Sequence, residues 1–444
     1  MIMGHPPVSQ DLRKRRVAAV ADEGVESGGR DGEVRPTRSA FAPIRRSIAV
    51  WGPGLLVMLA DTDAGNVVTA AQSGAQWGYR LLPLLLLLIP MLYLVQELTV
   101  RLGIYTGRGH GELIREQFGV GWACLSSLGL AAATIGSLIT EFTAVAGIGE
   151  LYGLPRSLTL PLATALLLFV VGTGSYRRVE RTALAIGLFE LAFFAVAWAA
   201  HPSLQIMARD AVDLPLGDPA FLYLAAAIIG ATFNPWMVFY QQSATVDKGL
   251  KPEDLSHARL DTGVGAVLTQ CLTGAVLIVA AVALRSGEIP ASLSSVGEIS
   301  EALTPLLGAE AGRLVFSVGV LGASLVAAIV SSLALAWGMG EVAGYRRSLE
   351  HRPFEAAWFY GVYAACVFGA AMLVWFVPNL VWLTIAAQVL NAFLMPLVIG
   401  LLVALAVKAL PEPLRLRGSR LCLVVCLSTA VSGLGLFGGI AGLF

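Results

Sequence analysis

The chain has 444 residues; 56% are hydrophobic, 14% are charged, and the mean hydropathy is +0.74. A soluble globular protein carries about 25% charged residues, so this composition excludes an ordinary soluble domain and indicates a protein with several membrane spans. The net charge is zero and the basic residues beyond the N-terminal tail are scattered over short loops, which gives nucleic-acid binding no support.

Residues 1–45 are polar and include a basic run, Arg-Lys-Arg-Arg at positions 13–16, followed by a stretch rich in Gly, Glu, Asp and Arg. Because they contain no apolar core, they do not resemble a signal peptide. We interpret them as a disordered cytoplasmic tail whose basic run anchors the topology, and residues 46–444 as a transmembrane transporter domain.

Eleven apolar stretches after the tail are long enough to span a bilayer, which takes about 20 helical residues. They lie near 48–73, 80–101, 120–150, 156–174, 180–200, 219–245, 260–285, 311–341, 355–377, 379–408 and 419–443. With the N-terminus placed inside, sixteen lysines and arginines fall in cytoplasmic loops or span ends and five in outer loops. Because positive loops stay in the cytoplasm, the chain is predicted to begin inside and end outside.

The first span is interrupted at its middle by Asp61, Asp63, Gly65 and Asn66. Acids near the bilayer midplane are costly and usually line a polar path. Gly65 and Asn66 allow the backbone to leave helical geometry, and a broken helix at this depth needs protein, water or an ion at its freed carbonyls. The alternative is a kinked helix whose acids pair with a neighbouring span.

The sixth span repeats this feature, because Asn234 and Pro235 interrupt an otherwise apolar helix. Two interrupted helices five spans apart predict two inverted five-helix repeats, spans 1–5 (about 48–200) and 6–10 (about 219–408), with an extra helix at about 419–443. The alternative for the sixth span is a simple proline kink.

Other polar residues lie at membrane depth. Glu97 and Arg101, four residues apart at the inner end of span 2, are expected to form an ion pair. Glu190 stands alone in span 5, and its role is open. The remaining polar residues at this depth are Glu141, Gln241, Gln242, Gln270, Gln388 and Asn391.

The two interruptions bring together oxygen donors. Asp63, Asn66 and Asn234 add side-chain oxygens to the carbonyls that two helix breaks release, and the first half of each helix points its negative end at the gap. Such a pocket suits a cation. Oxygen ligands without thiolate or imidazole favour magnesium, manganese or calcium over copper or zinc.

Residues 52–54 (Gly-Pro-Gly), 63–66 (Asp-Ala-Gly-Asn) and 74–79 (Gly-Ala-Gln-Trp-Gly-Tyr) resemble the first helix of the NRAMP divalent-metal transporters. Residues 230–235 (Gly-Ala-Thr-Phe-Asn-Pro) resemble the sixth-helix pattern of that family, and Gln388 resembles a glutamine of its tenth helix. The resemblance covers all eleven spans. It implies an all-α, LeuT-like fold with broken helices 1 and 6.

The resemblance also implies a set of functional residues. The metal ligands would be Asp63, Asn66, the Ala231 carbonyl and Asn234, with Gln388 as a gate or a further ligand. A supporting or coupling role falls to the residues around them, which are Asp61, Thr62, Gly65, Glu141 and Trp236.

Three departures from the family pattern bear on the substrate. Asn234 stands where members that take up manganese and iron carry a methionine, whose thioether favours softer metals. Trp236 replaces a histidine, and Ala144 stands where the third helix of the family carries its second acid. Ala64 in place of proline and the extra Asp61 are further differences. This combination is similar to the NRAMP-related magnesium transporters.

The leading hypothesis is uptake of divalent metal, Mg²⁺ first and Mn²⁺ second, by alternating access without proton coupling. One alternative is a proton-coupled Mn²⁺/Fe²⁺ symporter with Glu141 as the proton carrier. Another is an organic-solute symporter of the same fold, which two acids at the break argue against. A third possibility, a metal sensor, would need a soluble effector domain. An enzyme is the least favoured reading, because the sequence pairs no nucleophile with a base.

The cellular setting follows from the same reading. The protein is expected in a bacterial plasma membrane, with the metal ion and the lipid bilayer as its partners. The sequence suggests no resident cofactor, no nucleic-acid partner and no obligate protein partner.

Overall fold

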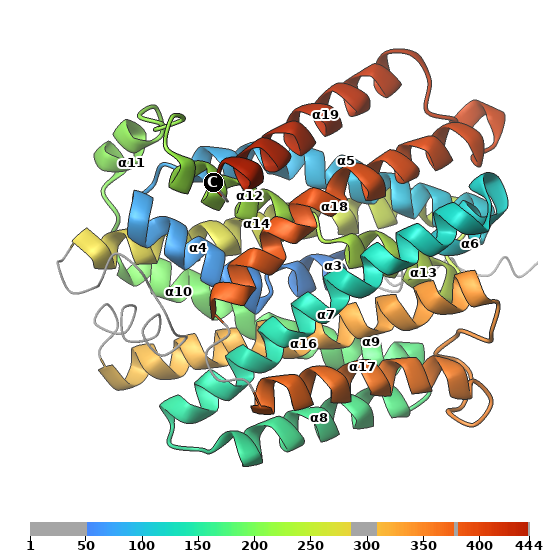
Figure 1. Cartoon of the computed structure of the whole chain (residues 1–444), viewed down its shortest axis with the longest axis horizontal. Coiled ribbons are helices and arrows are strands. Elements are labelled where there is room, and N and C mark those ends of the chain that lie inside the picture. The colour runs from blue at the N-terminus through green and yellow to red at the C-terminus, as the bar shows by residue number, and fades with distance from the viewer. Residues whose placement is uncertain (1–50, 286–308, 377–380, 443–444) are drawn as a thin grey trace, which may run out of the picture. The chain divides into compact units, whose positions relative to one another are not determined.

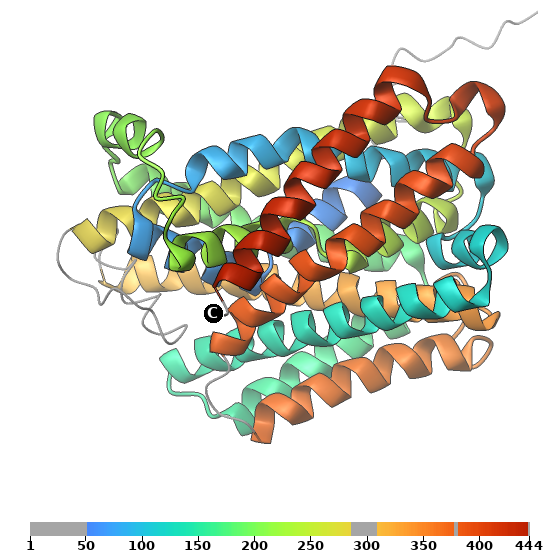
Figure 2. The same cartoon turned by 45° about the horizontal axis from the view of Figure 1, so that its top comes forward.

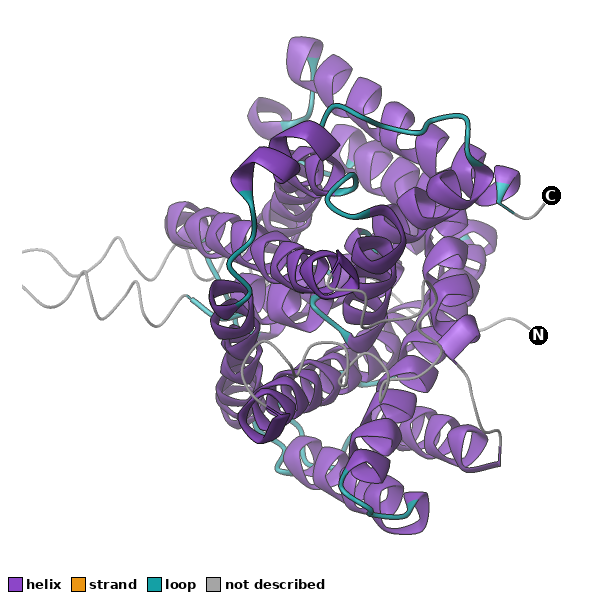
Figure 3. Ribbon diagram, turned by 90° about the vertical axis from the view of Figure 1, so that its left-hand side faces the viewer, coloured by secondary structure: helices purple, strands orange, loops and turns teal. Residues whose placement is uncertain are grey.

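The computed structural model describes residues 51–285, 309–376 and 381–442, and these ranges contain helices and no strand (Figure 3). The predicted tail, residues 1–45, lies outside them. The helices are α3 (Pro53–Asp61), α4 (Ala64–Trp77), α5 (Leu82–Thr106), α6 (His110–Phe118), α7 (Val120–Leu151), α8 (Arg156–Gly172), α9 (Tyr176–Gly187), η1 (Leu188–Leu191), α10 (Ala192–Ala199), α11 (Leu204–Asp210), α12 (Pro219–Thr232), α13 (Pro235–Asp247), η2 (Pro252–Asp254), α14 (Leu255–Arg285), α16 (Ala309–Ala343), α17 (Ala357–Phe376), α18 (Val381–Lys408), η4 (Glu412–Leu414) and α19 (Gly418–Ala441).

The helices follow the predicted spans. Among the described residues, nine helical segments are long and apolar enough to cross a membrane. The interrupted pair α3 and α4 and the shorter α8 occupy the other two predicted positions. Helix α5 runs on to Thr106, past its apolar stretch, and the expected ion pair between Glu97 and Arg101 forms there at 2.7 Å.

Both interrupted spans lie at the centre of the bundle. Helix α14 packs against α3, α4 and α5, while α12 packs against α18 and α19 (Figures 1 and 2). In the most apolar window of the span formed by α12 and α13, 94% of the residues are buried, against 28% in α19. The broken helices are therefore shielded from lipid by protein, as their unpaired backbone groups require.

The first helix is held at its start by a carboxylate from another helix. Asp261 of α14 accepts hydrogen bonds from the backbone N–H groups of Gly52 (3.2 Å), Gly54 (2.8 Å) and Leu55 (3.2 Å). The first N–H groups of a helix have no partner within it, and they form the positive end of its dipole. Asp261 satisfies three of them with a buried negative charge, so it fixes α3 to α14.

This anchor leads to a stability prediction. We expect Asp261→Asn to lower the melting temperature in detergent by a few degrees. The amide keeps one oxygen but turns an NH₂ group toward backbone donors, which costs about 1–3 kcal/mol. The control is Asp218→Asn, because the Asp218 side chain caps α12 in a partly exposed position and asparagine caps a helix about as well. Equal melting temperatures for the two variants would show that Asp261 does not anchor α3.

Candidate metal site

The first break is two residues long. Helix α3 ends at Asp61, and Thr62 (ψ 39°) and Asp63 (ψ 171°) leave helical geometry before α4 begins at Ala64. Asp63 caps α4 by accepting the Asn66 N–H at 2.7 Å, and the Asn66 side chain donates to the Asp61 carbonyl at 2.9 Å. The break therefore lies within the stretch that the sequence analysis singled out, but at Thr62 and Asp63; Gly65 and Asn66, which were expected to leave helical geometry, lie in the first turn of α4.

The second break faces the first. Helix α12 ends at Thr232 and α13 begins at Pro235, with Asn234 between them. The Asn234 Nδ2 donates to the Ala231 carbonyl at 2.8 Å and to Asp61 Oδ1 at 3.4 Å. One side chain thus joins the two breaks, and it stands where the resemblance places a metal ligand.

Helix α18 closes the site from a third side. A Cβ on Gly65 would overlap the Gln388 side-chain amide, and a Cβ on Gly230 would overlap the Gln388 carbonyl. Asn391 Nδ2 donates to Asn234 Oδ1 and, at 3.1 Å, to Gln388 Oε1. The sequence analysis did not assign Asn391 to the site. Its spacing of three residues from Gln388, which puts both on one helix face, is the signal that could have found it.

The site is buried and richer in acceptors than in donors. The exposed fractions of its predicted ligands run from 0% for Asp63 and Ala231 to 2% for Asn234, and the supporting Asp61 is also 0% exposed. In the described part of the chain, several buried oxygens there have no hydrogen-bond partner, namely Asp61 Oδ2, Asp63 Oδ2, Asn66 Oδ1, Glu141 Oε1 and Asn391 Oδ1. Each costs about 1–3 kcal/mol when left unpaired, so the cluster favours a cation.

The ligand chemistry is that of a hard ion. Among the described residues, no three His, Cys, Asp or Glu side chains lie close enough together to hold a metal. A metal at this point would therefore use amide and carbonyl oxygens beside Asp63. All five cysteines lie elsewhere, and none of them is buried.

The residues predicted to support the site make different contacts around the first and second breaks. Glu141 of α7 accepts the Ala64 N–H at 3.2 Å, so it holds the start of α4 beside the break. The Thr62 hydroxyl bonds to the Thr269 hydroxyl of α14 at 2.8 Å. Trp236, in the first turn of α13, is fully buried, and its indole N–H meets no acceptor in the described ranges.

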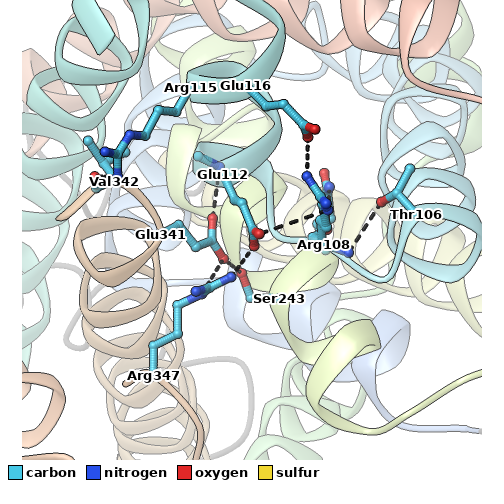
Figure 4. Close-up of polar contacts among 11 residues, drawn as sticks. Thr106, Arg108, Glu112, Arg115, Glu116, Ser243, Glu341, Val342 and Arg347 are labelled. Carbon is cyan, nitrogen blue, oxygen red and sulfur yellow. Dashed lines mark hydrogen bonds and ion pairs between the residues drawn. The ribbon is translucent and has the colours of Figure 1, made fainter. Parts of the chain in front are cut away.

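A second polar cluster joins α6, α13 and α16 (Figure 4). The buried Glu341 accepts the Ser243 hydroxyl at 2.6 Å and the Gly111 N–H at 2.8 Å. Arg347 lies between Glu341 and Glu112 and forms an ion pair with each. Ser243 lies nine residues beyond Asn234, about 13 Å along α13. The cluster therefore fixes the far end of the helix that begins at the second break.

Comparisons with known proteins bear on both the family and the fold. The model of the family described as natural resistance-associated macrophage protein-like (Nramp) matches residues 54–440. A divalent metal cation transporter of Mesorhizobium japonicum is 30% identical over 65% of this chain, and the match spans 66% of the relative, just under two thirds. An Eremococcus coleocola manganese transporter superposes with a TM-score of 0.72 at 16% identity, covering 96% of this chain and 91% of that one. MhsT bound to L-phenylalanine gives 0.58 at 13% identity, covering 88% and 98%.

The geometry gives a direct test of the site. We expect Asp63→Ala to reduce Mn²⁺ affinity at least tenfold in isothermal titration, because it removes the carboxylate that lies between the two broken halves. Asp213→Ala is the control, since this acid pairs with Arg80 at the surface. Affinity that is unchanged in Asp63→Ala, in a protein that elutes as a single species, would place the site elsewhere.

Proposed function

This chain belongs to the Nramp family, and from its site we propose that it takes up divalent metal ions, Mg²⁺ first and Mn²⁺ second. The observation that carries the proposal is the cluster of buried, unpartnered oxygens between two broken helices. Relatives described as divalent metal cation transporters and a structural neighbour described as a manganese transporter support the substrate class.

The preference for magnesium rests on Asn234. Its amide faces Asp61 and Asn391, so the ligands around the breaks are carboxylate, amide and carbonyl oxygens. Mg²⁺ binds such oxygens and keeps several of its waters, whereas a thioether at this place would favour softer metals. Manganese accepts the same oxygens, and we rank it second.

The closed site supports the proposal of alternating access. The predicted ligands are all buried, so this conformation is occluded. Asp261 anchors the start of α3, Lys248 binds the Trp51 carbonyl at 2.8 Å, and Glu341 holds the end of α13. By the predicted topology these contacts lie on the cytoplasmic side. Release of the metal inward would require them to separate.

The proton-coupled alternative depends on Glu141, whose free oxygen lies beside the break. A relay needs further titratable groups. His110, the buried histidine of the described part, lies at the start of α6 outside the spans, and burial lowers its pKa to about 4. It is therefore neutral at physiological pH. Trp236 and Ala144 occupy the positions at which the family pattern carries a histidine and an acid.

An organic-solute symporter is the alternative of another class. Its broken helices would bind an anionic carboxylate, and the two acids Asp61 and Asp63 at the first break would repel it. The lower TM-score of the phenylalanine-bound MhsT, 0.58 against 0.72, also favours the metal class.

The selectivity prediction concerns Asn234→Met. In proteoliposomes, we expect wild type to carry Mg²⁺ and Mn²⁺, and the variant to lose Mg²⁺ flux at least fivefold while gaining Cd²⁺ binding in titration. The reason is that a thioether replaces a hard oxygen.

The matched control is Met237→Leu, three residues further along in α13, which changes a buried side chain but leaves the residues of both breaks in place. A variant that gains no Cd²⁺ binding would show that Asn234 does not face the ion. Absence of any divalent flux in wild type would contradict the proposed function itself.

The coupling prediction is that metal enters without stoichiometric proton entry. The measurement is flux into proteoliposomes whose voltage is clamped by potassium and valinomycin, with a pH dye inside. We expect no metal-dependent acidification, because a relay of titratable groups is missing from the family positions. Acidification that vanishes in Glu141→Gln would instead establish the proton symporter.

A further inference from the structure

A charged cavity lies between α5, α14 and α19, at the ends that the predicted topology places on the cytoplasmic side. Its volume is about 330 Å³. The charged residues among the described ones that line it are three arginines, Arg101, Arg259 and Arg420, and one acid, Glu97. The other lining side chains are apolar apart from Tyr93. Three guanidinium groups against one carboxylate leave an excess of positive charge, so the cavity suits an anion.

Glu97 and Arg101 form the fixed wall of this cavity. Arg101 donates to Glu97 through its Nε at 3.1 Å and its Nη2 at 2.7 Å, and through its Nη1 to the Leu414 carbonyl at 3.4 Å. Its side chain is 11% exposed. Because each guanidinium nitrogen of Arg101 already has a partner, this arginine positions Glu97 and is not available to a ligand.

The two outer arginines keep unused donors. Arg259 donates its Nε to Glu97 at 2.7 Å and pairs with it through Nη2 at 2.6 Å, while its Nη1 has no partner among the described residues. The Arg259 side chain is 39% exposed. Arg420, in the first turn of α19, is exposed and forms no ion pair with a described residue. Guanidinium groups with unpaired N–H donors match the oxygens of a phosphate group.

An apolar groove of about 960 Å³ continues from the cavity between α5, α10 and α14, and it shares Tyr93 and Arg259 with the cavity. Its α14 side is lined by exposed residues on one face of the helix, namely Leu260, Val264, Val267 and Cys271. From Arg259 to Cys271 the helix rises by about 18 Å, close to half of a hydrocarbon core about 30 Å thick. The groove therefore has the length of one membrane leaflet.

We propose that this cavity and groove bind an anionic phospholipid of the phosphatidylglycerol class from the cytoplasmic leaflet. The phosphate lies between Arg259 and Arg420, and one acyl chain lies in the groove. Basic pockets at the cytoplasmic ends of membrane helices are suited to acidic lipid headgroups. A zwitterionic headgroup fits less well, because its ammonium group would add positive charge to a cavity whose acid, Glu97, already pairs with two arginines.

The proposed lipid site lies on the helix that anchors the first broken span. Arg259 precedes by two residues Asp261, which accepts N–H groups at the start of α3. Two residues are about 200° apart around a helix axis, so α14 presents Arg259 to the lipid and the buried Asp261 to the protein interior. A headgroup shared by Arg259 and Arg420 would tie the start of α14 to the start of α19. The inference does not depend on which metal is carried.

The test is native mass spectrometry of the full chain in detergent, with phosphatidylglycerol and phosphatidylethanolamine of the same acyl chains added at equal concentration. We expect wild type to retain phosphatidylglycerol at least fivefold better, and Arg420→Glu to remove that preference while leaving the Glu97 ion pairs in place. The matched control is Arg178→Glu, which should keep the preference. Arg178 is exposed in the first turn of α9, on the same predicted side of the membrane, and does not line the cavity.

A second variant tests the groove separately. Val267→Trp places an indole ring in the groove, and we expect it to lower the retention of phosphatidylglycerol at least threefold. Leu128→Trp is its control, because Leu128 is 68% exposed on α7, away from the groove. Added phosphatidylglycerol should also raise the melting temperature of wild type by a few degrees, and that of Arg420→Glu by less.

The outcomes separate a lipid site from a simple anion pocket. Equal retention of the two lipids by wild type, or a preference that Arg420→Glu keeps, would overturn the proposal. Displacement of the lipid by inorganic phosphate at equal concentration, or unchanged retention in Val267→Trp, would overturn it in favour of an anion pocket without a lipid chain. None of these measurements requires metal flux, so a failure of the proposed transport function would leave them unaffected.

Discussion

Every backbone N–H and C=O group at membrane depth must find a hydrogen-bond partner within the protein. Each of the two helix breaks frees such groups from their helical partners. The side chains at the breaks meet it: Asp63 accepts the Asn66 N–H, Asn66 donates to the Asp61 carbonyl, and Asn234 donates to the Ala231 carbonyl. The residues that cap the broken halves are therefore the same ones that the resemblance names as metal ligands. Fold and site cannot be varied independently at these positions.

The hydrogen bonds that cap the broken helices use the side-chain donors around the breaks and leave several acceptor oxygens without a partner. Once the amide groups of Asn66, Asn234 and Asn391 are used, what remains around the breaks is carboxylate and carbonyl oxygen. Such a surplus is unfavourable in a dry protein and favourable around a hard cation. Without a metal, the unpaired oxygens around the breaks raise the free energy of this conformation. Metal binding would therefore stabilise it, so that metal occupancy and conformation are coupled.

The span positions followed from hydropathy because bilayer thickness sets helix length, and the breaks followed because Asp61, Asp63 and Asn234 cannot stand in an ordinary apolar helix. Partners distant in sequence could not be found this way. Asp261 accepts the N–H of Gly52, 209 positions earlier, at the start of α3, and no local pattern records the pairing. Glu190 showed only as an isolated acid. Its complete burial, in a segment that packs against α16, is a tertiary fact.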